Sequence, residues 1–272
     1  MSSKNRSLNE RYAGDMTTPT AGNQVIARIA ALLRAVGAVE PEGASTSDLA
    51  RASGLARPTA HRMLTALADE GMVDRDPTSG RWMLGPELYL LGAGATSRYD
   101  ITAQARDVID RLARETGESA FLSARRGDET VCVFSQEGSF PLRSHVLHEG
   151  IRFPLGVASA GLVILSHLTD REVDEYFSRH RLDDEWGADH AESAVRERIR
   201  STRETGYAVN PALLVEGSWG MGAAVFDIAD RPAWALSLTG VQTRFTPERR
   251  REMGMLLLEQ AHVLSVRLRG RR

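Results

Sequence analysis

Residues 45–71, STSDLARASGLARPTAHRMLTALADEG, predict two short helices joined by a tight turn. Ser45 and Asp48 have the spacing of a capping box, and Gly54 can take the positive φ that ends a helix. Pro58 suits the first turn of a second helix, where its missing N–H is not needed. The apolar residues of this second helix recur at helical spacing and predict a buried stripe: Ala60, Met63, Leu64 and Leu67.

The opposite face of the second helix is small or basic, with Thr59, Arg62, Thr65 and Ala66 flanked by Arg57 and His61. Arginine can donate two hydrogen bonds to guanine, threonine offers a hydroxyl and a methyl group, and small residues allow close approach to a DNA groove. The alternative is an ordinary solvated face of a helical hairpin. Under the DNA-reading hypothesis, the base or near-base contacts are Arg57, Thr59, His61 and Arg62.

A hairpin follows, because residues 72–84, MVDRDPTSGRWML, place two apolar runs around a loop that contains glycine. Arg75 and Arg81 flank its tip and are the predicted phosphate contacts, whereas Trp82 is expected to pack the hairpin onto the domain. A further helix is predicted upstream, before Gly37, from the spacing of Val25, Ile29, Leu32 and Val36. Three helices followed by a hairpin form a winged helix-turn-helix.

Charge constrains how such a domain could bind DNA. Residues 1–97 hold ten Lys and Arg against ten Asp and Glu, and the whole chain has a net charge of −2. Phosphate affinity must therefore come from placement. Four acidic residues would have to point away from the duplex or be paired: Asp69, Glu70, Asp74 and Asp76. A neutral monomer should bind weakly, which predicts a dimer that reads two half-sites.

The composition, with 42% hydrophobic and 26% charged residues among 272, is typical of a globular protein with two domains. We predict a disordered arm over residues 1–22, the DNA-binding domain over 23–84, a linker helix over 85–98 and a second domain over 99–272. Cys132, the single cysteine, lies in the apolar run VCVF and is expected to be a buried strand thiol. The chain contains neither an 18-residue apolar stretch nor a signal-peptide core near Met1, so we expect a cytoplasmic protein with no membrane partner.

The second domain has an α+β pattern. Helices are predicted at 101–116, near 159–168, 170–180 and 189–205, and at 247–269, and strands at 119–125, 129–136, 219–227 and 232–240. Strands in hairpins with helices around them indicate an antiparallel sheet with flanking helices.

The sequence does not fit the common enzyme and metal-site motifs. The segment GVASAG would need glycine at Val157 to be a nucleophile elbow. His145 and His148 lie near Glu149, but a strand-like HVLHE would point the two imidazoles to opposite faces. The sequence has no P-loop, dinucleotide fingerprint, HExxH or CxxC. We therefore expect no catalytic residue, no metal site and no cofactor.

With both halves in view, the chain resembles the IclR family of bacterial transcriptional regulators from about residue 24 to residue 269. The matching segments are DLARASGLARPTAHRMLTALADEGMVDRDPTSGRWMLGPELYLLG in the first half and RETGES, GIRFPLGVASAG, ETGYAVN, GAAVFD and ALSLTG in the second. The resemblance implies a winged helix domain, a linker helix and a GAF-like effector-binding domain, assembled as homodimers or dimers of dimers. It also implies that a small organic acid binds the second domain and alters the affinity for double-stranded operator DNA.

The resemblance places the effector pocket at Ser159 and Ala160, whose backbone amides in relatives face the ligand carboxylate, and at the strand hydroxyls of Ser237 and Thr239. The position of Ser159 and Ala160 at a predicted helix start agrees with this placement, because free N–H groups at a helix start attract anions. Residues two apart on a strand also point to one side. The other predicted effector-binding residues lie in the apolar segment NPALLVEGSWGMG: Asn210, Trp219, Gly220 and Met221.

The chain departs from the family pattern in that segment and close to it. Relatives commonly have lysine where this chain has Leu162, and an acidic pair where it has Ala212 and Leu213. A frequent cysteine is replaced by Gly220, a frequent proline by Ala224 and a usual aspartate by Asn210. An apolar, roomier pocket would suit an aromatic or bulky acid. The alternative is that these residues simply pack the sheet.

We expect a ligand-responsive repressor of a catabolic operon. The sequence leaves two other functions open: a GAF-like small-molecule-binding enzyme, and a winged-helix module that binds proteins without reading bases. Arg62 and Thr59 on the exposed helix face argue against the second of these.

Overall fold

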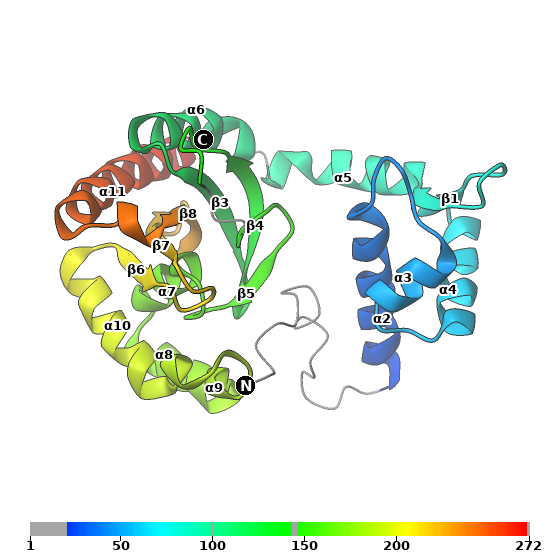
Figure 1. Ribbon diagram of the computed structural model, residues 1–272, viewed down its shortest axis with the longest axis horizontal. Helices are drawn as coiled ribbons and strands as arrows, with labels where there is room; N and C mark the ends of the chain where they lie inside the picture. The colour runs from blue at the N-terminus through cyan, green and yellow to red at the C-terminus, as the bar shows by residue number, and fades with distance from the viewer. Residues whose placement is uncertain (1–20, 100, 143–145, 271–272) are drawn as a thin grey trace. The chain divides into compact units, whose positions relative to one another are not determined.

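The computed structural model describes residues 21–99, 101–142 and 146–270, and the chain divides into two compact units, Met1–Tyr99 and Asp100–Arg272 (Figure 1). The predicted arm lies outside the described residues except at its end, because the first described helix, α2, begins at Ala21. Among the described residues, no helix is both long enough and apolar enough to cross a bilayer.

The first unit is the predicted winged helix-turn-helix. Its elements are α2 (Ala21–Gly37), α3 (Thr46–Ala52), α4 (Arg57–Asp69), β1 (Val73–Arg75), β2 (Trp82–Leu84) and α5 (Pro86–Tyr99). Ser45 caps α3 by accepting a hydrogen bond from the Asp48 amide at 3.2 Å, and Gly54 follows with a φ of +67°. The predicted helix boundaries around the turn are confirmed.

The core of the first unit lies where the three helices and the hairpin meet. Leu32, Leu64 and Trp82 are fully or almost fully buried there. β1 and β2 pair antiparallel, and the Trp82 indole donates to Thr46 Oγ1 at 2.9 Å. Trp82 therefore fixes the wing to the start of α3, as predicted.

The second unit is a single antiparallel sheet with helices on both faces (Figure 1). Its helices are α6 (Ile101–Thr116), α7 (Ser159–Ser166), α8 (Asp170–Arg179), α9 (Leu182–Trp186), α10 (Glu192–Thr205) and α11 (Pro247–Arg269), with short 3-10 turns η1 (Ala188–His190) and η2 (Gln242–Arg244). Its strands are β3 (Ser119–Arg126), β4 (Glu129–Gln136), β5 (Arg152–Pro154), β6 (Ala208–Pro211), β7 (Ser218–Phe226) and β8 (Pro232–Val241).

The strands lie in the order β5-β4-β3-β8-β7-β6. On one face α6 and α11 pack against Leu122, Met221 and Leu236. On the other face α7 packs against β7 and β8 together with Phe121 and Ala235. This arrangement confirms the predicted α+β fold and places the first turn of α7 over the centre of the sheet.

Four short elements in the second unit were not predicted: β5, β6, α9 and η2. The strand-like context expected for HVLHE is wrong, because Val146 lies in a bend, residues 147 and 148 have no regular secondary structure and Glu149 begins a turn; His145 lies outside the described residues. Cys132 is a buried thiol on β4, as predicted. Burial raises its pKa to about 12, so this thiol stays protonated and unreactive.

Candidate functional site

The exposed face of α4 carries the predicted base contacts. Arg62 is exposed and makes no hydrogen bond or ion pair with any described residue, so its guanidinium is available to a partner. Thr59 is partly buried at the first turn. Arg57 donates from Nε to Ser47 Oγ at 3.1 Å, and the His61 ring meets the Trp82 ring edge-on at 6.4 Å.

The two wing arginines hold the wing together. Arg75 donates from Nε to the carbonyl of Gly80 at 3.2 Å, and its guanidinium lies 5.4 Å from the centre of the Trp82 ring. Arg81 donates from Nη1 to the carbonyl of Gly43 at 2.9 Å, which ties the wing to the loop before α3. Both side chains are still exposed, so each can offer its remaining N–H groups to a phosphate.

Of the four acidic residues that would oppose DNA binding, one is held as a carboxylate by local hydrogen bonds and three lie exposed outside the first turn of α4. Asp76 closes the wing loop by accepting hydrogen bonds from the hydroxyl of Ser79 at 2.7 Å and from two loop amides, and the Ser79 hydroxyl is the main cause that lowers the Asp76 pKa. Asp69 and Glu70 lie exposed at the C-terminal end of α4, away from its first turn, and Asp74 lies exposed on β1. The electropositive groups of α4 are therefore concentrated at its N-terminal half.

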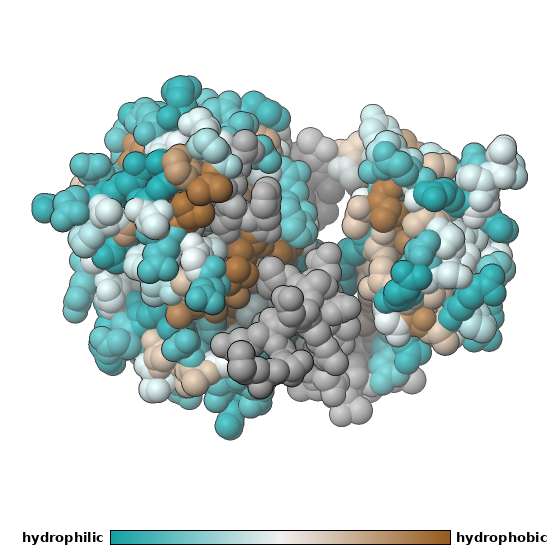
Figure 2. Space-filling model, in the orientation of Figure 1, coloured by the Kyte–Doolittle hydropathy of each residue, from teal (hydrophilic) through white to brown (hydrophobic). Residues whose placement is uncertain are grey.

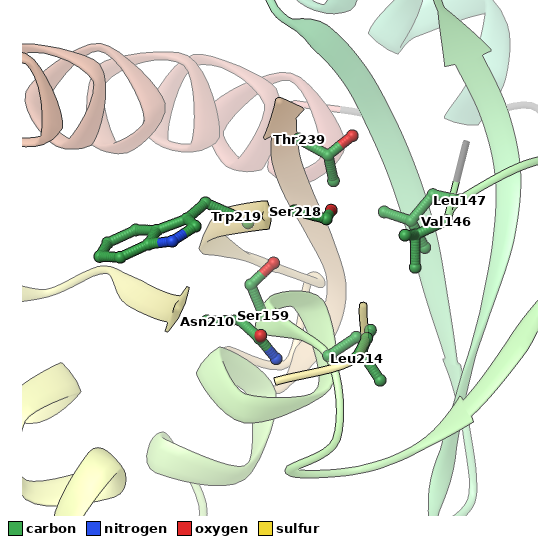
Figure 3. Close-up of a pocket in the computed structure, with 10 residues that line it drawn as sticks. Val146, Leu147, Ser159, Asn210, Leu214, Ser218, Trp219 and Thr239 are labelled. Carbon is green, nitrogen blue, oxygen red and sulfur yellow. The ribbon is translucent and has the colours of Figure 1, made fainter. Parts of the chain in front are cut away.

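The second unit contains a hollow between the first turn of α7 and the sheet; it is partly open to solvent and measures about 280 Å³ with that open space included (Figure 3). None of the residues that line it carries a charged side chain; they are Val146, Leu147, Ala158, Ser159, Asn210, Leu214, Ser218, Trp219, Gly220 and Thr239. A charged ligand must therefore be held by backbone groups and neutral side chains.

Backbone amides supply positive potential at one wall of this hollow. α7 begins at Ser159, and the first amide that donates along the helix belongs to Leu162, which bonds to the carbonyl of Ala158. The amides of residues 158–161 are buried and have no acceptor among the described residues. Together with the helix dipole, unpaired N–H groups at a helix start form a site for an anion.

Two hydroxyls of β8 face the same side of the sheet as α7. Thr239 pairs with Gly220 and Ser237 pairs with Gly222, and paired residues in an antiparallel sheet share a face. A Cβ at Gly222 would lie 3.1 Å from the backbone of Ser159, so glycine is needed there for α7 to approach the sheet. The hydroxyls of both Ser237 and Thr239 are buried and have no hydrogen-bond partner among the described residues.

The remaining predicted effector residues divide into three groups. The Asn210 amide is already engaged, because it donates to the carbonyl of Val157 at 2.7 Å and accepts from the Leu213 amide at 3.2 Å. Ala160 and Ser237 are buried behind the lining. The side chains of Trp219 and Met221 pack on the opposite face, with α11, and the Trp219 indole points away from the hollow (Figure 3).

Sequence reasoning missed one wall of the hollow, formed by Val146 and Leu147 from the connection between β4 and β5. Glu149 anchors this connection by accepting hydrogen bonds from the amide and the hydroxyl of Ser135 at 3.0 and 3.1 Å. The only sequence signal was an apolar pair, VL, between polar residues just before the matching segment GIRFPLGVASAG.

Comparisons with known proteins match both units of the chain. The model of the IclR helix-turn-helix domain matches residues 25–77, and the model of the bacterial transcriptional regulator IclR C-terminal domain matches residues 93–266. Similar curated proteins include the glycerol operon regulatory protein of Streptomyces griseus, which is 31% identical over 83% of this chain and 87% of its own length. The transcriptional repressor IclR of Escherichia coli is 24% identical over 83% of both chains.

The fold also matches a solved structure. A crystal structure of an IclR homolog from Microbacterium hydrocarbonoxydans, complexed with 4-hydroxybenzoate, covers 90% of this chain and 98% of its own with a TM-score of 0.71 at 20% identity. The chain therefore belongs to the IclR family of transcriptional regulators, with a helix-turn-helix domain that binds DNA and a C-terminal domain that binds a small-molecule effector.

Proposed function

We propose that this regulator is a repressor of a catabolic operon and that a small organic acid, bound in the hollow of the second unit, changes its affinity for DNA. The observation that carries the proposal is the set of unpartnered amides at residues 158–161, because Ala158 and Ser159 line a hollow that has no charged side chain and that also holds the unpartnered hydroxyl of Thr239. A carboxylate would satisfy the amides, and a polar group at the ligand's other end would satisfy a hydroxyl.

The lining favours a compact ligand. The hollow is partly open to solvent, and its volume of about 280 Å³ includes that open space, so the enclosed part is smaller. The solved homolog binds 4-hydroxybenzoate, a single ring with one carboxylate and one hydroxyl. We therefore propose a monocyclic aromatic acid or a similarly small acid.

A direct experiment tests this function. DNA that the full-length protein selects in vitro is labelled, and its binding is followed by fluorescence anisotropy while a panel of small organic acids, including 4-hydroxybenzoate, is added. We expect at least one acid to change the affinity for the selected DNA, whereas its neutral amide analogue has no effect. If no acid changes DNA binding or the melting temperature, the second unit is not an acid sensor.

Arg62 gives a prediction for the DNA-binding half. Its free guanidinium lies on the face of α4 beside Thr59, so Arg62→Ala should cost about 1–3 kcal/mol of binding free energy on the selected sequence. Binding to random DNA of equal length should change little, and the exposed Arg51, which is paired with Asp48, serves as the control position. Equal losses on both DNAs would show that Arg62 contacts only phosphate.

Removing the hydroxyl of Thr239 should have opposite effects on the stability of the ligand-free protein and on its affinity for the acid. Thr239→Val keeps the shape and removes a buried hydroxyl that has no protein partner, so the ligand-free protein should be equally or more stable. The same change should weaken binding of the acid by about tenfold. Thr239→Ser, which keeps the hydroxyl, should bind nearly normally in calorimetry. A destabilised valine variant with unchanged acid affinity would contradict the proposed role.

We further propose that the protein acts as a homodimer or a dimer of dimers. The face shown in Figure 2 is largely hydrophilic, with hydrophobic residues gathered in a few small patches. Exposed apolar side chains follow one another on α5, where Tyr89, Leu90 and Leu91 are 77%, 61% and 54% exposed. A second copy would cover such a stretch and would bring a second recognition helix to the DNA.

A further inference from the structure

The carbonyl of Val157 lies directly behind the amides of the proposed anion site, two residues before Ser159. It is contacted from two sides by elements that are distant in sequence. Asn210 on β6 donates to it from Nδ2 at 2.7 Å, and His190 in η1 places Nε2 3.3 Å from the same oxygen.

His190 is fully buried, and both of its ring nitrogens face carbonyl groups. While Nε2 faces Val157, Nδ1 lies 3.1 Å from the carbonyl oxygen of Trp186. A neutral imidazole has a single N–H and can donate to only one of these oxygens, whereas an imidazolium can donate to both. His190 is therefore suited to hold the Val157 carbonyl and has no direct contact with the hollow.

The geometry of the peptide bond connects this contact to the pocket. A trans peptide is planar, so the C=O of Val157 and the N–H of Ala158 point in opposite directions. Donors on the carbonyl side fix that plane, and Ala158, whose amide lies on the other side of it, is one of the residues that line the hollow. The orientation of Ala158 in turn sets the first turn of α7, which carries the other unpartnered amides.

We propose that His190 and Asn210 are positioning residues of the effector site: from behind, they hold the peptide plane whose amide side receives the ligand's carboxylate. The inference rests on the proposed function, because it assumes that the amides at residues 158–161 bind an anion. It adds a dependence on pH, since an anion in front of Val157 favours the imidazolium form of His190, which donates to both carbonyls and adds positive charge.

The charged groups that face His190 are Asp189 on η1 and Arg198 on α10. Burial is the main cause that lowers the pKa of His190, and Arg198 acts in the same direction, whereas the two carbonyls and Asp189 oppose it. The imidazole is therefore neutral in the ligand-free protein near neutral pH. Since an anion raises the pKa again, ligand binding takes up a proton, and the affinity for an acid should increase as the pH falls.

The test uses calorimetric titration of the full-length protein with benzoate, and with benzamide as the neutral comparison, at about pH 6 and about pH 8. The wild type should bind benzoate more tightly at the lower pH. His190→Leu should lose about tenfold in benzoate affinity and lose the pH dependence. His190→Gln keeps a donor for Val157 but cannot titrate, so it should stay within about threefold of the wild type at the higher pH and show no pH dependence. Benzamide affinity should respond to neither variant.

Each possible result decides a separate point. If the wild type binds no benzoate, the anion site fails and this inference fails with it. If all three proteins bind benzoate equally with the same pH profile, the positioning role is refuted while the anion site stands. If the His190→Gln and His190→Leu variants lose benzoate affinity equally at the higher pH, His190 contributes only through the packing of its imidazole. Should the leucine variant fail to fold, the pH profile of the glutamine variant still decides.

Discussion

Replacing Trp82 with alanine is expected to destabilise the first unit by about 3–5 kcal/mol, the usual loss for a large buried aromatic side chain. Trp82 is 2% exposed, packs among the three helices and donates to Thr46, so its removal also frees the wing from the start of α3. Urea unfolding of the full chain should show an earlier transition for the first unit and an unchanged one for the second. The affinity of the Trp82→Ala variant for the selected DNA should fall as well, because the wing and α4 lose their fixed positions.

Trp82→Phe is the matched control for this change. Phenylalanine keeps most of the buried surface and loses the indole N–H, so the loss should shrink to about 1 kcal/mol or slightly more. A variant with alanine at Trp82 that unfolds at the wild-type urea concentration would show that the wing does not depend on this anchor.

Replacing Glu118 with alanine should cost the second unit about 3 kcal/mol, because the carboxylate is buried between two arginines. Glu118 is 2% exposed and accepts from Arg244 Nε at 2.5 Å and from Arg249 Nη2 at 3.0 Å. Both guanidinium groups also donate to the carbonyl of Thr116, so the cluster joins the end of α6 to the start of α11. Both arginines are partly solvated, so the expected loss of stability lies at the low end of the range for removing one partner of a buried ion pair.

The surface pair of Arg111 and Glu115 provides the comparison, since it has a similar distance of 2.7 Å but leaves both side chains 41% exposed. Glu115→Ala should change the free energy of unfolding by about 0.5 kcal/mol or less. Thermal unfolding of both variants measures the difference. Equal effects at the two positions would mean that burial of Glu118 contributes nothing.

The helices were predictable because their buried residues repeat with the helical period over several turns. In α6 the spacing of Ile101, Ala105, Val108 and Leu112 predicted both the helix and its buried face. The strands β5 and β6 offered no such repeat. They are three and four residues long, end in Pro154 and Pro211, and are defined by pairing with β4 and β7. Such pairing is a tertiary interaction that a short window of sequence does not contain.

In the pocket, too, local patterns were predictable from the sequence and tertiary contacts were not. The sequence indicated that Ser159 and Thr239 could share a site, because a helix start and alternation along a strand are local properties. Alternation also separates Gly220, which faces α7, from Trp219 and Met221, whose side chains face α11. The prediction that Trp219, Gly220 and Met221 all bind the effector did not take this alternation into account. The wall formed by Val146 and Leu147 comes from a connection with no periodicity, so only the folded chain reveals it.

Arg75 bonds to the wing's own backbone and Arg81 to the loop before α3, and both bonds affect how the regulator binds DNA. Cationic side chains that approach phosphates displace condensed counterions, and the gain in ion entropy supplies most of the affinity for random sequence. In a charge-balanced domain whose wing arginines also serve the fold, that gain is small. Random DNA should therefore hold the protein only briefly, so most of the residence time is spent where the bases themselves are read.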